Sequence, residues 1–538
     1  MQIEDLSRRL REIKSHHFLL IAILVLSLFL QSARLDWGLV TNNMEINGLP
    51  AFHIAEWYVV SIPYTMMQRG DLNAHHFIEP SMFYNSMFVV FTIISKITEV
   101  QSFTQYIWIA RVMAIIFTLG VVFLVYLTGK EAAGVTVGLY AALLMALNPY
   151  YLWFSSIAKE DPMMVFMITL SMYFFARYLS SRNTNYFLLA MAAAGFAAST
   201  KYPGGLMLPF LIFLYFIYDR AASVLERLKT VARSMAVYVL AFIAGTPFSV
   251  ITMDEFLKGA AGEFEHYTTY HPGFLHFTWF VHVETITGLW DAANIWGKNG
   301  YGLTLLLLLA GSLVIVSGVR RMDARKRYTW LMLLGWILLA LFVFGFLIMV
   351  KMGNQMMIMT PAAMVIAGFG LERMLAKLRS VHIRRVAGII IIGLIFTYAL
   401  SGIVSSRNDN RYYAAEWLTE NVDPDERIAT TLFVYLPDNF KNISLLPPDI
   451  VYVEESDFDY IILSSWEYQR YIESPDVYPE DADFYNSVLS GNTLYKPVAA
   501  FERTETSRQR TLNFGLRALT AEKYGGEVDI HIFRRSKS

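Results

Sequence analysis

The topology of this chain depends on the stretch "SMFYNSMFVVFTIISKITE", residues 81–99. This stretch is apolar and close to the roughly 20 residues that a helix needs to cross a hydrocarbon core. Loops on the cytoplasmic side of a membrane collect Lys and Arg, so the basic segments decide whether 81–99 crosses. If it lies at the surface instead, all of the basic segments fall on one side: 1–17, 177–183, 219–233, 320–328 and 372–385. If it crosses, the N-terminal segment is separated from the other four. We therefore predict that 81–99 lies in the membrane interface.

The remaining apolar stretches predict a polytopic α-helical membrane protein. The 538 residues are 55% hydrophobic and only 17% charged, whereas about a quarter of the residues of a soluble domain are charged. We predict about eleven spans, in addition to interfacial helices: 18–35, 105–127, 132–150, 163–181, 186–199, 203–219, 234–252, 301–320, 328–350, 355–373 and 386–404. The protein is expected to be integral to the cell (plasma or inner) membrane. The chain contains no cysteine, which excludes disulfides and cysteine-ligated zinc.

The N-terminus has the pattern of a signal sequence. Arg8, Arg9, Arg11 and Lys14 precede "FLLIAILVLSLFL" (18–30), and "QSA" (31–33) resembles a cleavage site. We favour an uncleaved signal anchor, because the many later spans need no separate export signal.

The predicted spans divide the chain into two domains. Residues 1–405 form the transmembrane domain, with 36–104 as its first outer loop, and residues 51–70 mix apolar and polar side chains as a helix in the interface plane does. After residue 405 the composition changes, and we predict a small soluble α/β domain, 406–538, outside the membrane. Its predicted elements are a helix over 411–422 and strands over 427–435, 460–466, 497–501 and 528–533.

Ionisable residues gather at the outer ends of the predicted helices. Charges near membrane depth are costly and mark functional sites. Carboxylates beside lysines suit a reaction on a lipid phosphate, because lysines hold phosphate and a carboxylate removes a proton from a hydroxyl. The candidate bases are Glu56 and Asp161, with Asp71 as a weaker third. The candidate phosphate-binding residues are Lys201, Lys159, His53 and Arg34.

Structural roles compete with each of these assignments. Lys159 can extend to the interface as long basic side chains do, and Asp161 before Pro162 can cap a helix. Glu56 can lie on a solvated helix face. His75, His76 and Glu79 suggest a metal site, but adjacent histidines rarely face one ligand on a helix, so we predict none.

Several outer segments carry motifs in a specific order: "HIAE" (53–56), "GDLNAHHFIEP" (70–80), "SSIAKEDPMMVF" (155–166), "GFAASTKYPGGLMLP" (195–209), "GTPFSVITMDEFL" (245–257), "EHYTTYHPG" (265–273) and "YYAAEWLTENVDPDERIA" (412–429). With these segments, most of the chain resembles the integral-membrane GT-C glycosyltransferases. The resemblance is to the branch of the protein O-mannosyltransferases and the lipid A aminoarabinose transferase. His75, His266 and His271 lie in these motifs and are further site candidates.

The resemblance implies a polyprenyl-phosphate-linked sugar as donor, transfer with inversion, and a hydroxyl acceptor on a protein, lipid or glycan. It implies no redox cofactor and no nucleic-acid partner, and no divalent metal is indicated. Family members often show "HPDE" where this chain has "HIAE" (53–56), and the aspartate of that motif is normally the acidic catalytic residue. Here Ile54 stands in place of the proline and Ala55 in place of the aspartate. Glu56 is the nearest substitute, although one residue on a helix turns the side chain by about 100°.

Two other function classes stay open at this stage. A transporter or flippase for a lipid-linked substrate would favour broken helices, charges near the membrane midplane and an inverted repeat. Here the charges cluster at helix ends. A catalytically inactive, GT-C-like binding subunit is compatible with Ala55.

Overall fold

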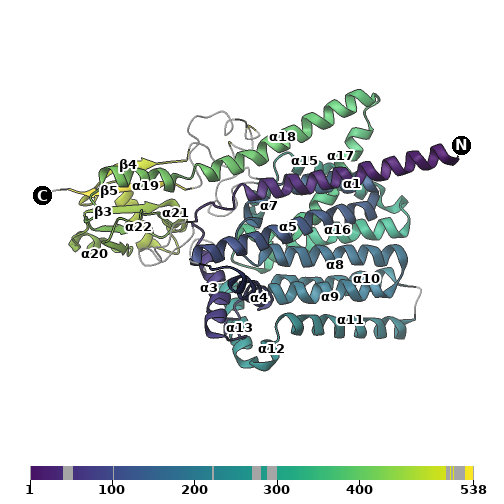
Figure 1. Ribbon diagram of the computed structural model, residues 1–538, viewed down its shortest axis with the longest axis horizontal. Helices are drawn as coiled ribbons and strands as arrows, with labels where there is room; N and C mark the ends of the chain where they lie inside the picture. The colour runs from purple at the N-terminus through teal and green to yellow at the C-terminus, as the bar shows by residue number, and fades with distance from the viewer. Residues whose placement is uncertain are drawn as a thin grey trace.

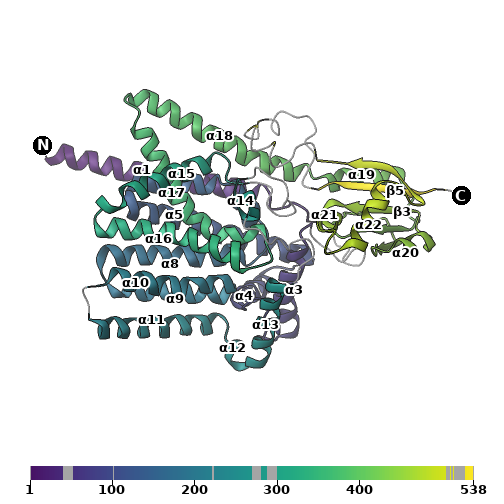
Figure 2. The ribbon, with the colours of Figure 1, turned by 180° about the vertical axis from the view of Figure 1, so that it is seen from behind.

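The structure is a computed structural model that describes residues 2–39, 52–100, 102–220, 223–269, 280–287, 300–503, 509, 513, 516 and 528–536. Long helices run side by side in a bundle, and a part that contains a β-sheet lies at one end of it (Figure 1). Seen from behind, α15 (Thr304–Gly318), α16 (Ala324–Phe342) and α17 (Thr360–Ala376) lie over the face that Figure 1 hides (Figure 2).

Each of the eleven predicted spans overlaps a helix of the bundle, and the span 132–150 overlaps both α6 (Val135–Ala146) and α7 (Pro149–Ser155). The other spans overlap α1 (Gln2–Ser32), α5 (Phe103–Ala133), α8 (Asp161–Ser181), α9 (Thr184–Thr200), α10 (Met207–Tyr218), α11 (Val224–Gly245), α15 (Thr304–Gly318), α16 (Ala324–Phe342), α17 (Thr360–Ala376) and α18 (Val381–Arg407). Among the described residues, seven helices are long and apolar enough to cross a membrane, or eight if the bent pair α6–α7 counts as one span. The count of eleven stays a prediction.

Local sequence explains the bend and the close packing. Asn148 accepts a hydrogen bond from the Tyr151 N–H at 2.8 Å and Pro149 starts α7, so the chain turns by 60° between α6 and α7. Between α15 and α17, Gly311 and Gly370 let the backbones touch. A Cβ on Gly370 would lie 2.1 Å from the Leu307 carbonyl oxygen. Small residues are the usual means of close approach between membrane helices.

Short helices cover the end of the bundle that carries the sheet. They are α3 (Ile54–Arg69), α4 (Met82–Ile97), α12 (Phe248–Ile251) and α13 (Met253–Thr269). Figure 1 shows α4 almost end-on, across the direction of the bundle. This arrangement agrees with the prediction that 81–99 lies in the interface. The N-terminus, the α10–α11 connection and the α17–α18 turn, which are basic, lie at the opposite end (Figure 1).

The C-terminal part holds a five-stranded sheet in the order β2-β1-β3-β5-β4. Strands β1 (Ile428–Thr430), β2 (Ile443–Leu445) and β3 (Tyr460–Ser464) are parallel, whereas β5 (Ile530–Arg535) is antiparallel to β3 and to β4 (Tyr495–Phe501). Helices α19 (Asn410–Asn421), α20 (Ile450–Glu455), α21 (Ser465–Ile472) and α22 (Pro479–Leu489) complete it. Four strands and α19 match the predicted elements. The three-residue β2 was not predicted.

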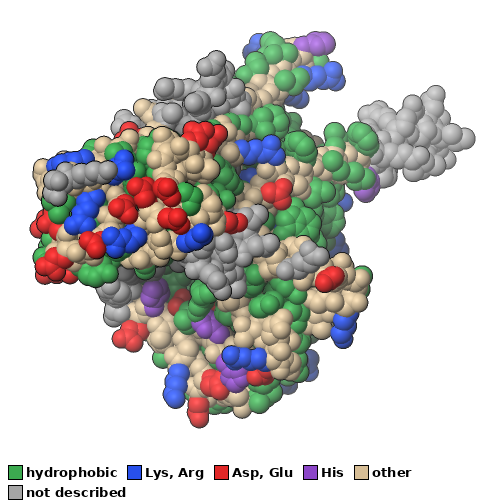
Figure 3. Space-filling model, turned by 60° about the vertical axis from the view of Figure 1, so that its left-hand side comes forward, with side chains coloured by type: hydrophobic (Ala, Val, Ile, Leu, Met, Phe, Trp, Pro, Cys, Tyr) green, Lys and Arg blue, Asp and Glu red, His purple; other side chains and the backbone are tan. Residues whose placement is uncertain are grey.

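Two contacts fasten this part to the first outer loop. Arg411 is buried, pairs with Asp409 at 2.7 Å, donates to the Phe52 carbonyl at 3.2 Å and lies 3.8 Å from the Phe52 ring. The Gly38 N–H donates to the Tyr412 hydroxyl at 2.9 Å. Figure 3 shows acidic and basic side chains spread over this part, whereas hydrophobic side chains cover much of the bundle beside it.

Candidate functional site

The ends of α8 and α9 bring charged residues together. Asp161 is the first residue of α8, followed by Pro162, and Lys201 follows the last residue of α9 in extended backbone. Because α8 begins where α9 ends, the segment 159–161 and Lys201 meet at the end of the bundle that carries the sheet. Glu79 reaches the same place from the loop between α3 and α4.

One buried ammonium group is the centre of this cluster. The Lys201 Nζ lies 2.8 Å from Glu160 Oε1, 3.1 Å from Glu79 Oε1 and 3.5 Å from Asp161 Oδ1. The Lys159 Nζ lies 3.6 Å from the other oxygen of Asp161. We call Lys201, Lys159, Glu79, Glu160 and Asp161 the lysine–carboxylate cluster. Asp161, Lys159 and Lys201 were each predicted as site residues, and the structure brings the three together.

Burial and pairing set the charges of the cluster. Burial alone would lower the pKa of Lys201, but Asp161, Glu160 and Glu79 outweigh it and raise that pKa well above its ordinary value. Burial alone would raise the pKa of Glu160, yet Lys201 and Lys159 hold it at about 2. The pKa of Glu79 is raised well above its ordinary value, mainly by burial. Lys201 and Glu160 are therefore charged, and Glu79 is the carboxyl group that most readily keeps a proton.

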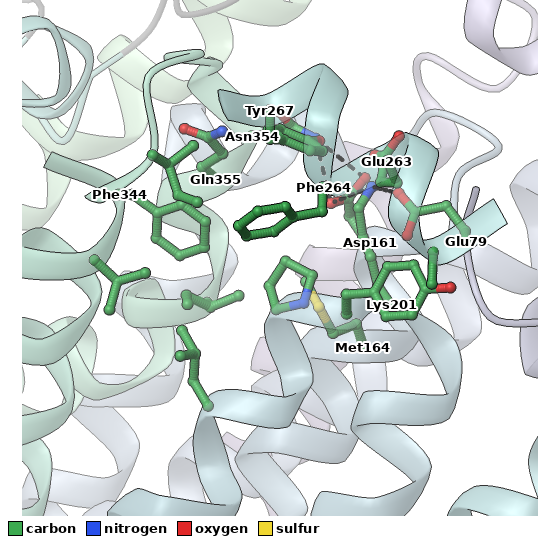
Figure 4. A pocket seen from close by; sticks show the side chains of 17 residues that line it. Glu79, Asp161, Met164, Lys201, Glu263, Phe264, Tyr267, Phe344, Asn354 and Gln355 are labelled. Atoms are coloured by element: carbon green, nitrogen blue, oxygen red, sulfur yellow. Dashed lines mark hydrogen bonds and ion pairs between the residues drawn. The ribbon is translucent and has the colours of Figure 1, made fainter. Parts of the chain in front are cut away.

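The cluster opens onto a cavity of about 350 Å³. Figure 4 shows Lys201, Glu79, Asp161 and Glu263 on one side of it and Phe344 on the other. The lining residues are Glu79, Asp161, Met164, Lys201, Tyr202, Pro203, Leu206, Ala260, Glu263, Phe264, Tyr267, Val343, Phe344, Ile348, Asn354, Gln355 and Ile358. The cavity therefore has a charged wall and an apolar wall.

The far wall comes from the break between α16 and α17. There the chain passes through a π-helical turn, η3 (Val343–Leu347), and a 3-10 helix, η4 (Gly353–Met359). From η4 the Asn354 Nδ2 donates to both oxygens of Asp161, at 3.3 and 3.4 Å. Irregular backbone at this depth is tolerated where it lines a cavity.

Glu56, the first candidate base, is paired with its neighbours away from the cavity. Its oxygens accept hydrogen bonds from Arg111 Nη2 at 2.6 Å, Arg111 Nε at 2.7 Å and the Ala158 N–H at 2.7 Å, and the side chain is fully buried. Glu56 does not line the cavity. A base must reach the acceptor hydroxyl and have room for its proton, so this geometry argues against Glu56 as the base. Glu56 instead holds the loop that leads to Asp161.

His53 and Arg34 also lie away from the cavity. Burial, then the neighbouring Lys159, Arg111 and Arg411, lower the pKa of His53 well below its ordinary value, so this imidazole is neutral. The Arg34 guanidinium is buried 3.9 Å from the Trp153 ring and donates to the Trp153 carbonyl at 3.3 Å. Neither residue lines the cavity. Their predicted role in phosphate binding does not fit this placement.

The remaining candidates are peripheral or outside the described residues. His75 bridges Asp71 Oδ2 at 3.0 Å and Glu255 Oε2 at 2.9 Å on the surface and ties the first outer loop to α13. His266 lies on α13 but does not line the cavity, and His271 falls outside the described residues. Within the described part of the chain, no group of three or more His, Asp or Glu side chains is arranged to hold a metal ion.

The sequence reasoning missed Glu263 and Asn354. Glu263 lies in an ordinary amphipathic segment, and nothing local separates it from Glu265. Asn354 had a usable signal, because "GNQ" (353–355) interrupts two apolar runs, and polar backbone breaks of this kind line cavities in membrane proteins.

Comparisons with known proteins support a glycosyltransferase fold. Residues 23–253 match the family model described as dolichyl-phosphate-mannose-protein mannosyltransferase. The crystal structure of ArnT from Cupriavidus metallidurans bound to undecaprenyl phosphate has a TM-score of 0.50 at 13% identity and covers 96% of this chain and 97% of that one. The archaeal oligosaccharyltransferase AglB from Archaeoglobus fulgidus, in complex with an inhibitory peptide and a dolichol-phosphate, has a TM-score of 0.51 at 12% identity. That match covers 90% of this chain and 73% of AglB. The predicted resemblance to GT-C glycosyltransferases is confirmed.

A curated relative is similar over a shorter region. An uncharacterized protein of Aquifex aeolicus (strain VF5) is 28% identical over 118 residues. The match covers 22% of this chain and 24% of that protein, so the chain aligns with about a quarter of the relative's length.

Proposed function

We propose that this chain, which has the fold of the GT-C glycosyltransferases, moves a sugar from a polyprenyl-phosphate donor to a hydroxyl acceptor on the outer membrane face, with inversion at the anomeric carbon. One observation carries the proposal: a cavity at the end of a membrane helix bundle has the lysine–carboxylate cluster on one wall and hydrophobic side chains on the other. Residues 1–405 would form the catalytic transmembrane domain and 406–538 a soluble domain outside the membrane.

The two walls suit the two halves of such a donor. A polyprenyl phosphate joins an anionic headgroup to a long hydrocarbon chain. Phe264, Phe344 and Ile348 provide apolar contact for the first isoprene units. Lys201 supplies the positive charge of the lining, whereas Lys159 does not line the cavity but lies 3.6 Å from Asp161, which does. The volume of about 350 Å³ lies in the range of small-ligand pockets.

The phosphate has to compete for Lys201. The longest ion pairs of Lys201 are to Asp161, at 3.5 Å, and to Glu79, at 3.1 Å. Glu79 repels an incoming phosphate least when it carries a proton, which its raised pKa favours. We propose that the donor phosphate replaces Glu79 as a partner of Lys201, while Glu160 stays paired with Lys201.

The neighbours support the donor class. ArnT is bound to undecaprenyl phosphate in its crystal structure, and AglB is in complex with a dolichol-phosphate. Both are polyprenyl phosphates. The acceptor of the proposed reaction is a hydroxyl of a protein, a lipid or a glycan.

Donor turnover tests the proposal. The purified full-length protein in lipid nanodiscs is incubated with a panel of polyprenyl-phosphate sugars and hydroxyl acceptors, and released polyprenyl phosphate and product mass are measured. We expect turnover of at least one donor, lowered in Lys201→Met, which removes the cation proposed to contact the phosphate, and kept in Lys258→Met, a matched change at an exposed position on α13. Absence of turnover with every donor and acceptor would contradict the proposal.

Ala55 favours a second candidate function, that of a catalytically inactive GT-C-like subunit. Alanine stands where family members often have the catalytic aspartate, so such a subunit would lack that carboxylate but would still bind the donor. In the same assay it would show donor binding that depends on Lys201 but no turnover.

A further inference from the structure

Ala55 leaves the proposed reaction without the carboxylate expected in the first outer loop, and Glu56 is held elsewhere. The base must then come from another carboxylate that reaches the cavity. Among the described residues, three acidic side chains line it: Glu79, Asp161 and Glu263. Their partners distinguish them.

Asp161 and Glu79 are already engaged by cations. Both oxygens of Asp161 are occupied, one beside Lys201 at 3.5 Å and the other beside Lys159 at 3.6 Å, and Asn354 donates to each. Cations and hydrogen-bond donors around a carboxylate stabilise its ionised form and weaken it as a base, which disfavours Asp161. Glu79 also lies 3.1 Å from Lys201, but burial raises its pKa well above the ordinary value, so it keeps a proton and cannot accept another.

Glu263 reaches the cavity from α13 without such a partner. Within the described part of the chain, no ion pair or side-chain hydrogen bond engages its carboxylate, although 91% of the residue's surface is buried. Ala260, Glu263, Phe264 and Tyr267 all line the cavity, and their spacing of i, i+3, i+4 and i+7 puts them on one helix face. Figure 4 shows Glu263 beside the lysine–carboxylate cluster.

The position of α13 is fixed at both ends. Near its start, a Cβ on Gly259 would lie 2.7 Å from atoms of Phe77, and Glu255 binds His75 at 2.9 Å. Near its end, the Tyr267 carbonyl accepts hydrogen bonds from the Met349 and Val350 N–H groups, both at 3.2 Å. Glu263 is therefore presented to the cavity by an anchored helix.

We propose that Glu263 is the general base of the transfer, an inference that rests on the proposed function. The acceptor O–H bond breaks and its proton moves to a Glu263 oxygen. The acceptor oxygen forms the new bond to the anomeric carbon, while the bond from that carbon to the phosphate oxygen breaks and its electron pair leaves on the polyprenyl phosphate.

The basicity of Glu263 suits this step. Burial raises the pKa of Glu263 to about 7. A base is most effective when its pKa lies near the working pH, because it is then both ionised often enough and basic enough to accept a proton. Activity should therefore rise as the pH increases through about 7, since the ionised carboxylate is the active form.

The test compares Glu263→Gln with Glu265→Gln, an exposed position two residues along the same helix. We expect turnover to fall by about 10²–10⁴-fold in Glu263→Gln, as removal of a general base does, with donor binding and melting temperature retained. Glu265→Gln should stay near wild type. The rise of kcat/KM with pH should be present in wild type and absent from the residual activity of Glu263→Gln.

The outcomes separate this inference from the proposed function. A wild-type protein that turns over no donor contradicts the function. An active wild type with an unchanged rate and pH profile in Glu263→Gln overturns the role of Glu263. If Glu263→Gln does not fold, Glu263→Asp replaces it. A changed midpoint of its pH profile supports the proposal, and an unchanged midpoint overturns it.

Discussion

The end of the bundle that carries the sheet holds two buried sets of charges, the Glu56–Arg111 pair and the lysine–carboxylate cluster. In the pair, the two side chains are 0% and 1% exposed and the shortest contact is 2.6 Å. The Ala158 N–H also donates to Glu56, and Arg111 donates to the Trp37 carbonyl, each at 2.7 Å. In the cluster, the ion pairs are 2.8–3.6 Å long, three carboxylates share one lysine, and one side opens onto the cavity. A closed pair supports the fold, whereas an open, crowded cluster can exchange a protein contact for a substrate contact.

The largest expected effect is on the closed pair. Arg111→Met leaves Glu56 buried without its cation, and breaking a buried pair costs about 3–5 kcal/mol. We expect a strong fall in melting temperature and in the yield of folded protein. The double variant Glu56→Leu/Arg111→Met should recover part of the loss, because no unpaired charge remains. A wild-type melting temperature in Arg111→Met would remove the distinction between the two sets.

The next effect is on the cluster and concerns binding. Lys201→Met should weaken donor affinity by roughly ten- to a hundredfold, the equivalent of a lost charge-assisted hydrogen bond. The fold should be affected less than in Arg111→Met, because the cavity-facing carboxylates can take up protons. Titration with a fluorescent polyprenyl phosphate measures the affinity, and Lys258→Met, at an exposed position on α13, is the control. Unchanged affinity in Lys201→Met would make its role purely structural.

Within the cluster, Glu160 and Glu79 should respond in opposite directions. The folded-state pKa of Glu160 is lowered to about 2, so its ionised form stabilises the fold above its unfolded pKa, and this contribution is lost as the pH falls toward about 2. The pKa of Glu79 is raised, so its contribution is present at low pH and is lost as the pH rises.

Substitution by glutamine tests this difference. At pH 7, Glu160→Gln should lower the melting temperature, whereas Glu79→Gln, which resembles the protonated side chain, should leave it unchanged or raise it. Equal destabilisation by both variants would show that the two carboxylates are equivalent.

The smallest effect is expected at the His75 bridge. Hydrogen bonds to Glu255 and Asp71 raise the pKa of His75, so the bridge is complete below the unfolded pKa of histidine and weakens as the pH rises through the folded value. Because the side chain is half exposed, His75→Asn should lower the melting temperature only slightly, and more at pH 6 than at pH 8. A larger effect at pH 8 would contradict the assignment.

Most of the predictions made from the sequence rested on hydropathy, which indicated the helices, and on charged residues at helix ends, which indicated the site. Each predicted span overlaps a helix, and Asp161, Lys159 and Lys201 meet because the ends of neighbouring helices are close in space. The role of Glu56 could not be read from its own segment, because its partner lies 55 positions further along the chain, in α5. Arg111 did offer a signal, since an ionisable residue inside an apolar span requires a buried partner. The sequence offered no such signal for Glu263, because its place in the cavity lining depends on the packing of α13 against the loop before α4.

The account's central claim is that the chemistry takes place at the cavity and that the Glu56–Arg111 pair supports the fold. The most direct test measures polyprenyl-phosphate release per folded molecule for wild type, Glu263→Gln and Glu56→Gln in the same nanodiscs, with the folded fraction taken from size-exclusion chromatography. We predict a loss of at least about a hundredfold for Glu263→Gln, the lower end expected for a missing catalytic group, and a clearly smaller loss for the folded Glu56→Gln protein. A folded but inactive Glu56→Gln protein beside an active Glu263→Gln protein would contradict the account.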